Sequence, residues 1–196
     1  MPSPILHTTS GYIVYRLLEK RAPIHNTPGT GNLPKTLLLS LGFSMLPDID
    51  SVVGFLAGDF GKYHNNATHS LVVGLLAALF AAAVATTLRS ISIRKVFLIA
   101  FFSYSAHILL DFLTIGRGVM AFWPLTDERY LFPWPLIYGV RWSDGLLSIR
   151  HIWTLISESA LAAFLIAATH YWIARNQNDE SRKENTEALT GVGEER

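Results

Sequence analysis

The chain has 196 residues, of which half are hydrophobic and 16% are charged, and its formal net charge is +1. Ordinary soluble domains carry about 25% charged residues, so this composition argues against a soluble globular protein. Cysteine is absent, which excludes disulfides, thiolate metal ligands and a cysteine nucleophile. The low net charge also excludes the strongly basic surface that nucleic-acid binding requires, so no nucleic-acid partner is expected.

The first two apolar segments are shorter or less regular than a simple membrane helix. Residues 4–18 are mixed in composition and no basic region precedes them, which predicts a short or tilted span, or an interfacial helix, rather than a cleavable signal peptide. Residues 36–57 contain Pro47, followed by Asp48 and Asp50. Because proline lacks an N–H group and restricts the preceding residue, we expect the helix to break there.

Three long apolar runs follow, at residues 70–88, 96–115 and 152–174. Each reaches the length of about 20 residues that a helix needs to cross about 30 Å of hydrocarbon. We therefore predict an all-α protein, an integral membrane helical bundle with four or five membrane segments in the lipid bilayer. The membrane-embedded domain comprises residues 1–174, and residues 175–196 form a charged tail that we expect to be disordered.

The basic residues predict the orientation of the bundle. Most of the 16 lysine and arginine residues are placed in the cytoplasm if residues 16–35, the loop at residues 89–95 and the charged tail lie there, as the positive-inside rule favours. The loops at residues 58–68 and 116–151 then lie outside. The second of these loops is rich in aromatic residues, which is typical of a belt at the lipid interface or of a lid over a site near the headgroups.

The strongest chemical signal is a polar stripe in the second of the long runs. Ser103, His107, Asp111 and Thr114 recur at helical spacing and so share one face. Ionisable side chains within a membrane helix are costly and by default mark a functional site with partners inside the bundle. The alternative is a His107–Asp111 pair that satisfies only itself and stabilises helix packing.

Two further signals lie at the same predicted depth. His64 and His69 precede the first long run, and Thr68 is the expected N-cap that would place His69 in the first helical turn. Asp48 and Asp50 point to opposite sides of a regular helix, so both can bind one ion only through a turn. Imidazole and carboxylate ligands suit Zn, Mn or Fe. Three segments therefore deliver metal-ligating groups to one level.

The two ends of the bundle each add a candidate. His7 reaches that level only if the N-terminal segment descends from the outer face, whereas a cytoplasmic N-terminus would exclude it. Glu158 lies within the last apolar run, and His151 is seven residues before it on the same helical face. Whether Glu158 and His151 join the site is left open by the sequence.

An ordered set of short motifs carries a resemblance to a known family. An N-terminal His comes first, then Leu-Pro-Asp-Ile-Asp, Thr-His-Ser, His-Ile-Leu-Leu-Asp and Trp-Pro-Leu. Over residues 5–125 this set resembles the YdjM-like family of bacterial inner-membrane, metal-dependent hydrolases, which is similar by fold to zinc-dependent phospholipase C and P1-type nuclease. The resemblance implies a helical phosphoesterase core, and it implies metal binding by His7, one or both of Asp48 and Asp50, His69, His107 and Asp111.

We therefore expect a metal-dependent hydrolase in the bacterial inner membrane, with its C-terminal tail in the cytoplasm. Its expected substrate is a lipid or lipid-linked phosphoester near the outer leaflet, and its expected cofactor is one or two divalent metal ions, zinc first and Mn or Fe as alternatives. Asp111 or Asp50 is the expected acceptor of a proton from water. Two alternatives are a cation or proton transporter and a non-catalytic membrane protein that holds a metal. The complete set of expected metal ligands is His7, Asp48, Asp50, His64, His69, His107 and Asp111.

Overall fold

The structure is a computed structural model that describes residues 2–19, 34–58, 60–88, 92–140 and 148–191. The regular elements in these ranges are helices, and two isolated β-bridges join loop residues. The elements are α1 (Pro4–Leu18), α2 (Lys35–Met45), the 3₁₀ turn η1 (Leu46–Asp48), α3 (Ile49–Leu56), α4 (Phe60–Tyr63), the 3₁₀ turn η2 (Ala67–His69), α5 (Leu71–Leu88), α6 (Ile93–Phe112) and α7 (Arg150–Gly191).

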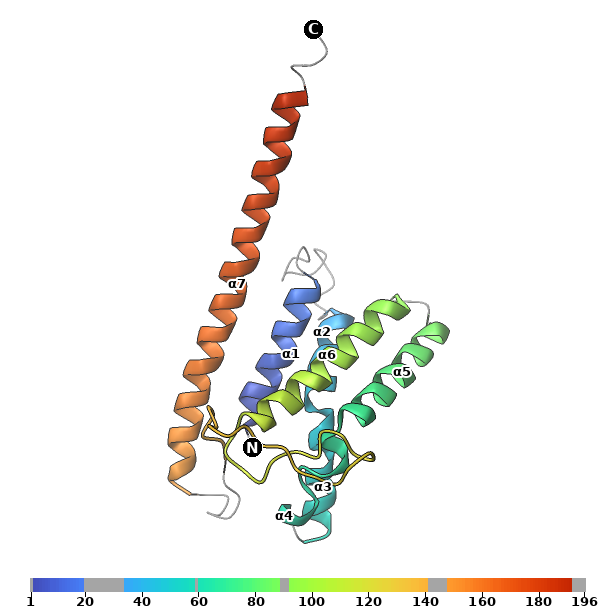
Figure 1. The fold of residues 1–196 in the computed structure, drawn as a ribbon, viewed down its shortest axis with the longest axis vertical. Coiled ribbons are helices and arrows are strands. Elements are labelled where there is room, and N and C mark those ends of the chain that lie inside the picture. The colour runs from blue at the N-terminus through green and yellow to red at the C-terminus, as the bar shows by residue number, and fades with distance from the viewer. Residues whose placement is uncertain (1, 20–33, 59, 89–91, 141–147, 192–196) are drawn as a thin grey trace.

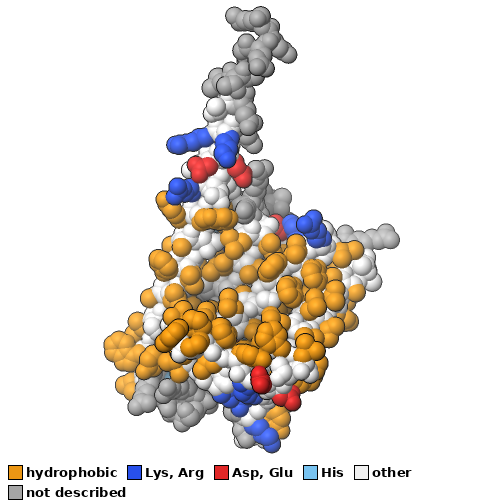
Figure 2. Space-filling model, in the orientation of Figure 1, with side chains coloured by type: hydrophobic (Ala, Val, Ile, Leu, Met, Phe, Trp, Pro, Cys, Tyr) orange, Lys and Arg blue, Asp and Glu red, His pale blue; other side chains and the backbone are white. Residues whose placement is uncertain are grey.

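The helices have the lengths and surfaces of membrane segments. Lys35–Leu56, Ile93–Phe112 and His151–Lys183 are long and apolar enough to cross a bilayer, and Leu71–Thr87 is a shorter apolar helix. Figure 2 shows hydrophobic side chains over the broad middle of the visible face, with charged groups toward its two ends. This distribution fits a hydrocarbon core flanked by headgroup layers. The predicted all-α membrane bundle is confirmed.

Small residues allow α1, α2 and α6 to pack closely. A Cβ atom at Gly11 of α1 would lie 2.5 Å from Ser44 Oγ of α2, so only glycine fits that contact. Nearby, the Ser40 hydroxyl of α2 donates a hydrogen bond to the Gly11 carbonyl oxygen (2.6 Å). The same hydroxyl lies 2.7 Å from Ser103 Oγ of α6. Close approach at small residues and hydrogen bonds between helices are the usual means of association within a bilayer.

The expected break at Pro47 is a change of helix type and not an interruption. The 3₁₀ turn η1 joins α2 to α3, and Lys35–Leu56 remains one continuous helical segment. Proline removes one backbone donor, and the tighter 3₁₀ turn lets the chain stay helical past it. The prediction of an irregularity at this position was right, but the prediction of a broken helix was wrong.

Helix α7 stands apart from the other helices over much of its length (Figure 1). Only 17% of its apolar window is buried inside the protein. The helix continues to Gly191, so most of the tail that we expected to be disordered is helical; residues 192–196 lie outside the described residues. The tail contains no proline, and Glu and Arg, which have high helix propensity, are frequent in it.

A long loop, residues 113–140, closes the end of the bundle at which α6 ends and α5 begins. Its Ile115 N–H donates to the Ile137 carbonyl oxygen (3.0 Å), which folds the loop back on itself. The Ala121 carbonyl oxygen accepts the N–H of Leu71, the first residue of α5 (2.9 Å). The N-terminus of α1 lies at this same end of the bundle, and the C-terminal end of α7 lies at the opposite end (Figure 1).

Candidate metal centre

Helix α6 contributes two buried side chains one turn apart. His107 Nε2 lies 3.2 Å from Asp111 Oδ2, and both side chains are closed off from solvent. On the other side of the ring, His107 Nδ1 lies 2.7 Å from the carbonyl oxygen of Ser44 in α2. Because a carbonyl only accepts hydrogen bonds, Nδ1 carries the proton and donates it. This arrangement leaves Nε2 of His107 as the nitrogen that can bind a metal.

Helix α1 brings His7 to the same place. The His7 ring stacks on the His107 ring with their centroids 3.7 Å apart. His7 Nε2 lies 3.9 Å from Asp111 Oδ1 and 3.9 Å from Asp48 Oδ2. His7 reaches the cluster because α1 begins at the end of the bundle where α6 finishes, which is the direction of α1 that the sequence analysis required.

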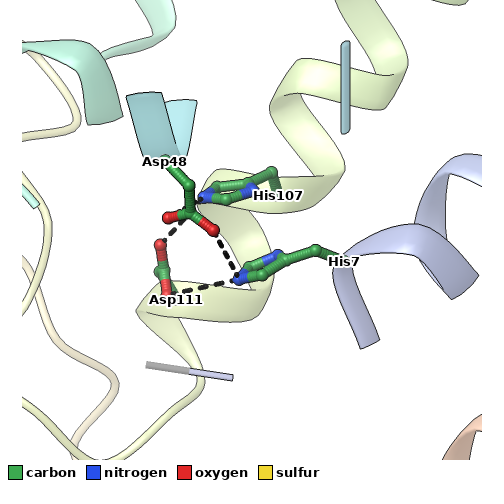
Figure 3. Close-up of side chains that lie close together, drawn as sticks. All are labelled: His7, Asp48, His107 and Asp111. Atoms are coloured by element: carbon green, nitrogen blue, oxygen red, sulfur yellow. Dashed lines mark ion pairs between the residues drawn. The ribbon is translucent and has the colours of Figure 1, made fainter. Parts of the chain in front are cut away.

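Asp48, at the end of η1, completes a group of four. Figure 3 shows His7, Asp48, His107 and Asp111 pointing toward one another from α1, η1 and α6. Two atoms bound to one zinc ion at about 2.1 Å are at most about 4.2 Å apart. The four histidine–aspartate ion-pair distances within this group run from 3.2 to 3.9 Å. With one ligand atom taken from each residue, the four atoms lie within 4.8 Å of one another, so a small contraction would bring them onto one ion.

A second group of potential ligands shares Asp48 with the first. His64 Nδ1 and His69 Nε2 lie 3.8 Å and 3.5 Å from Asp48 Oδ1. His69 Nε2 is also 3.0 Å from Asp111 Oδ2 and 3.1 Å from His107 Nε2, so the two groups are in direct contact. Asp48 belongs to both groups: its Oδ1 faces His107, His64 and His69, and its Oδ2 faces His7.

Asp50, also a predicted ligand, lies outside both groups and contacts two of their histidines. Its Oδ1 lies 2.9 Å from His64 Nδ1, its Oδ2 lies 3.2 Å from His69 Nδ1, and it accepts a hydrogen bond from the Thr68 hydroxyl (2.6 Å). A carboxylate on the outer nitrogen of an imidazole fixes the orientation of the ring and raises its basicity as a ligand. Asp48 and Asp50 contact opposite nitrogens of the His69 ring, Nε2 and Nδ1, and both contact Nδ1 of His64.

His69 lies just before α5 and not in its first turn, which corrects the expected N-cap. Ser70, and not Thr68, caps the helix: its Oγ accepts a backbone N–H of α5 (3.1 Å) and donates to a carbonyl oxygen of the long loop (2.5 Å). Thr68 instead binds Asp50, and its carbonyl oxygen accepts the hydroxyl of Tyr104. These contacts hold η2, and with it His69, against α6.

The electrostatics of the cluster favour a bound cation. Several buried atoms lack a hydrogen bond, among them both ring nitrogens of His7, both carboxylate oxygens of Asp111 and Oδ1 of Asp48. Each unsatisfied buried polar atom costs about 1–3 kcal/mol, and one ion can satisfy several of them at once. Burial disfavours a charged imidazole at His69, but the carboxylates of Asp111, Asp48 and Asp50 around it outweigh burial and raise its pKa well above the usual value. A metal would displace that proton.

Two arginines of the long loop hold the segment that carries His64, and the sequence analysis gave them no role. Arg117 donates to the carbonyl oxygen of His64, and Arg129 donates to that of Asn65 (2.8 Å). Burial, together with the charge of Arg117, lowers the pKa of Arg129. These contacts join positions far apart in the chain, and no local pattern in the sequence indicates them.

Glu158 of α7, which the sequence left open, belongs to neither ligand group. Its Oε2 accepts the backbone N–H of Ser3 (2.7 Å), at the start of α1. His151, which is also in α7, lines a cavity together with Glu158. Neither residue is therefore assigned to the metal centre.

An apolar helical bundle that buries aspartate and histidine side chains at one end is an integral membrane protein with a candidate metal centre. The chain belongs to the YdjM inner membrane protein family, whose sequence profile matches residues 1–179. This confirms the family resemblance and assigns the protein to the inner membrane. The chain is also similar to inner membrane protein YbcI of Escherichia coli (strain K12), with 33% identity over 108 residues, or 53% of this chain. The match spans 62% of that relative, less than two thirds of its length. No solved structure matches the chain.

Proposed function

We propose that the protein is a membrane-bound, metal-dependent hydrolase that cleaves a phosphoester in a lipid or a lipid-linked molecule. The observation that supports this most is Asp48, which is shared by two buried groups of metal-ligating side chains. A pair of metal ions at such a site would polarise a phosphoryl oxygen and acidify a water molecule. The nitrogen and oxygen donors fit zinc, and Mn or Fe are alternatives.

We assign metal binding and proton transfer to different residues of the cluster. His7, His69 and His107 would hold the metal through ring nitrogens, with His107 fixed in one tautomer by the Ser44 carbonyl. Asp111 is the proposed proton acceptor, because its carboxylate lies in the cluster and its Oδ1 makes no hydrogen bond in the described structure. Both oxygens of Asp50 are engaged by His64, His69 and Thr68. The proton-accepting role that Asp50 shared in the sequence analysis therefore passes to Asp111.

The proposed substrate follows from where the cluster lies. The cluster is at one end of the apolar bundle, beside the long loop, and Trp134 and Tyr138 of that loop are exposed. Tryptophan and tyrosine gather at the level of the lipid headgroups, where the phosphoester of a lipid is found. We place this end at the outer leaflet and the C-terminal end of α7 in the cytoplasm, as the distribution of basic residues favours.

Elemental analysis combined with a hydrolysis assay tests the proposal. Purified protein in detergent should contain at least one Zn, Mn or Fe per chain and should cleave a phosphodiester or lipid phosphate in a reaction that a chelator abolishes. His107→Ala and Asp111→Asn should each lower metal content and remove the activity. His170→Ala is the matched control, because His170 lies outside the cluster and bonds to Tyr12 of α1 (2.8 Å).

Each other outcome points away from the proposal. Full metal content in both cluster variants would show that the metal is bound elsewhere. Metal-dependent ion flux in liposomes without hydrolysis would favour the transporter. If metal raises the thermal stability of the protein but the protein shows neither hydrolysis nor ion flux, a non-catalytic protein that holds a metal would be favoured.

A further inference from the structure

A cavity of about 800 Å³ lies between the first turns of α7 and residues 136–139 of the long loop. Leu136, Ile137 and Leu161 provide much of its apolar lining. Its volume is within the range of about 300–1,000 Å³ that is typical of small-molecule sites, which are mostly apolar with a few convergent polar groups. The cavity is therefore large enough for part of a lipid.

The most unusual group in this cavity is the carboxylate of Glu158. The residue is 1% exposed, and its Oε2 accepts the N–H of Ser3 at 2.7 Å. Its Oε1 is buried and has no hydrogen-bond partner in the described structure. A carboxylate inside a membrane segment is costly and normally has a partner. The unused oxygen is available to accept a hydrogen bond from a bound molecule.

The lining defines the chemistry of that molecule. The ionisable residues Glu158 and His151 line the cavity, and the aromatic residues Tyr138 and Trp153 line it too. A carboxylate beside aromatic rings attracts an ammonium group, through charge and through cation–π interaction. The apolar side chains suit an acyl chain. The combination fits an amphiphile with a positively charged head and a hydrocarbon tail.

The cavity is next to the metal centre but separate from it. Ser3, which binds Glu158, precedes the potential ligand His7 by one turn of α1. Between them, Leu6 packs with Ile137 and Ala162 in one buried cluster. A molecule bound to Glu158 would therefore sit beside the metal centre at the same end of the bundle, with a wall of apolar side chains between them.

We propose that this cavity binds a membrane lipid with an ammonium headgroup, with Glu158 binding the ammonium. Tyr138 and Trp153 flank the headgroup, and the apolar lining takes part of a hydrocarbon tail. The site does not depend on the hydrolase activity proposed above, because none of the metal-ligating residues lines it.

Lipid binding to delipidated protein in detergent, measured by native mass spectrometry, tests this proposal. The probes are phosphatidylethanolamine and phosphatidylcholine, which carry an ammonium group, and phosphatidylglycerol, which does not. The wild-type protein should prefer at least one ammonium lipid over phosphatidylglycerol by about tenfold or more, the effect expected of one charge-assisted hydrogen bond. Glu158→Gln keeps the shape and the acceptor for Ser3 but removes the charge, so the preference should fall to near unity.

Three controls keep the result interpretable. Glu128→Gln removes an exposed carboxylate from the long loop and should leave the preference unchanged. Trp153→Leu should weaken the preference in part, which provides a second variant if Glu158→Gln fails to fold. His107→Ala should retain the preference even after its metal is lost, so failure of the hydrolase proposal is distinguishable from failure of this one. The proposal is overturned if wild type shows no preference, if Glu158→Gln keeps it, or if His107→Ala loses it.

Discussion

Replacing Asp50 with asparagine tests whether this residue binds the metal or orients the residues that bind it. The Asp50 carboxylate touches the Nδ1 atoms of His64 and His69, at 2.9 and 3.2 Å, and not the nitrogen of His69 that faces the cluster. Asparagine has nearly the same size and keeps one acceptor oxygen, but it has no charge and presents an NH₂ group to one of the two rings. Asp50→Asn should therefore disturb the orientation of the rings without removing a ligand.

The expected loss of metal affinity follows from these contacts. Removing a partner of a metal-binding histidine typically lowers metal affinity about 10–100-fold. At about 1.4 kcal/mol for each factor of ten, this corresponds to about 1.4–2.8 kcal/mol. Because Asp50 supports two rings, His64 and His69, we expect the effect to lie in the upper half of that range.

Zinc titration against a chromophoric chelator measures affinity and stoichiometry together. Asp50→Asn should bind as many ions per chain as wild type at saturating zinc, with lower affinity, whereas Asp111→Asn should bind fewer ions. Asp127→Asn, in the exposed part of the long loop, should match wild type in both quantities. Loss of an ion from Asp50→Asn at saturating zinc would show that Asp50 is a ligand, and an unchanged affinity would show that its contacts do not matter. Either result would refute the reasoning.

Two further predictions concern packing and orientation. Gly11→Ala should lower the thermal unfolding temperature in detergent, because its Cβ would meet Ser44 Oγ at 2.5 Å, and such overpacking costs about 1–3 kcal/mol. Gly42→Ala, whose Cβ would have nothing within 4 Å, should not lower it; equal temperatures would contradict the close contact of α1 with α2. In intact cells, a membrane-impermeant thiol reagent should label a cysteine at Asp127 but reach one at Ser181 only after lysis, and the reverse pattern would place the candidate metal centre on the cytoplasmic side.

The parts of the site that follow from helical periodicity could be predicted from the sequence. His107 and Asp111 are four residues apart in an apolar helix, so they had to share a face, and their burial follows from the polar stripe they form with Ser103. His7 was harder to place, because its depth depends on the direction in which α1 crosses the bundle. That direction depends on packing against α2 and α6, which the sequence of α1 alone does not specify.

Other parts depend on geometry that no sequence pattern contains. Whether Asp48 or Asp50 faces the histidine nitrogens inside the cluster depends on the exact geometry of the turn at Pro47. Thr68 and Ser70 are both good helix caps two residues apart, and the long loop selects Ser70 by accepting its hydroxyl hydrogen bond at 2.5 Å. The roles of Thr68, Arg117 and Arg129 rest on contacts between distant segments, which the sequence does not show.

The irregular turn at Pro47 also affects a histidine on another helix. Proline has no N–H group, and in the 3₁₀ turn a backbone donor reaches back three residues, as Ile49 N–H does to the Leu46 carbonyl oxygen. Pro47 lies three residues after Ser44 and has no N–H to donate to the Ser44 carbonyl oxygen, which accepts the Nδ1 proton of His107, 63 residues further along the chain. One imino acid in α2–α3 thus selects the tautomer of an imidazole in α6. The same short segment therefore meets His107 on both sides of its ring, through the Ser44 carbonyl oxygen at Nδ1 and through the Asp48 carboxylate at Nε2.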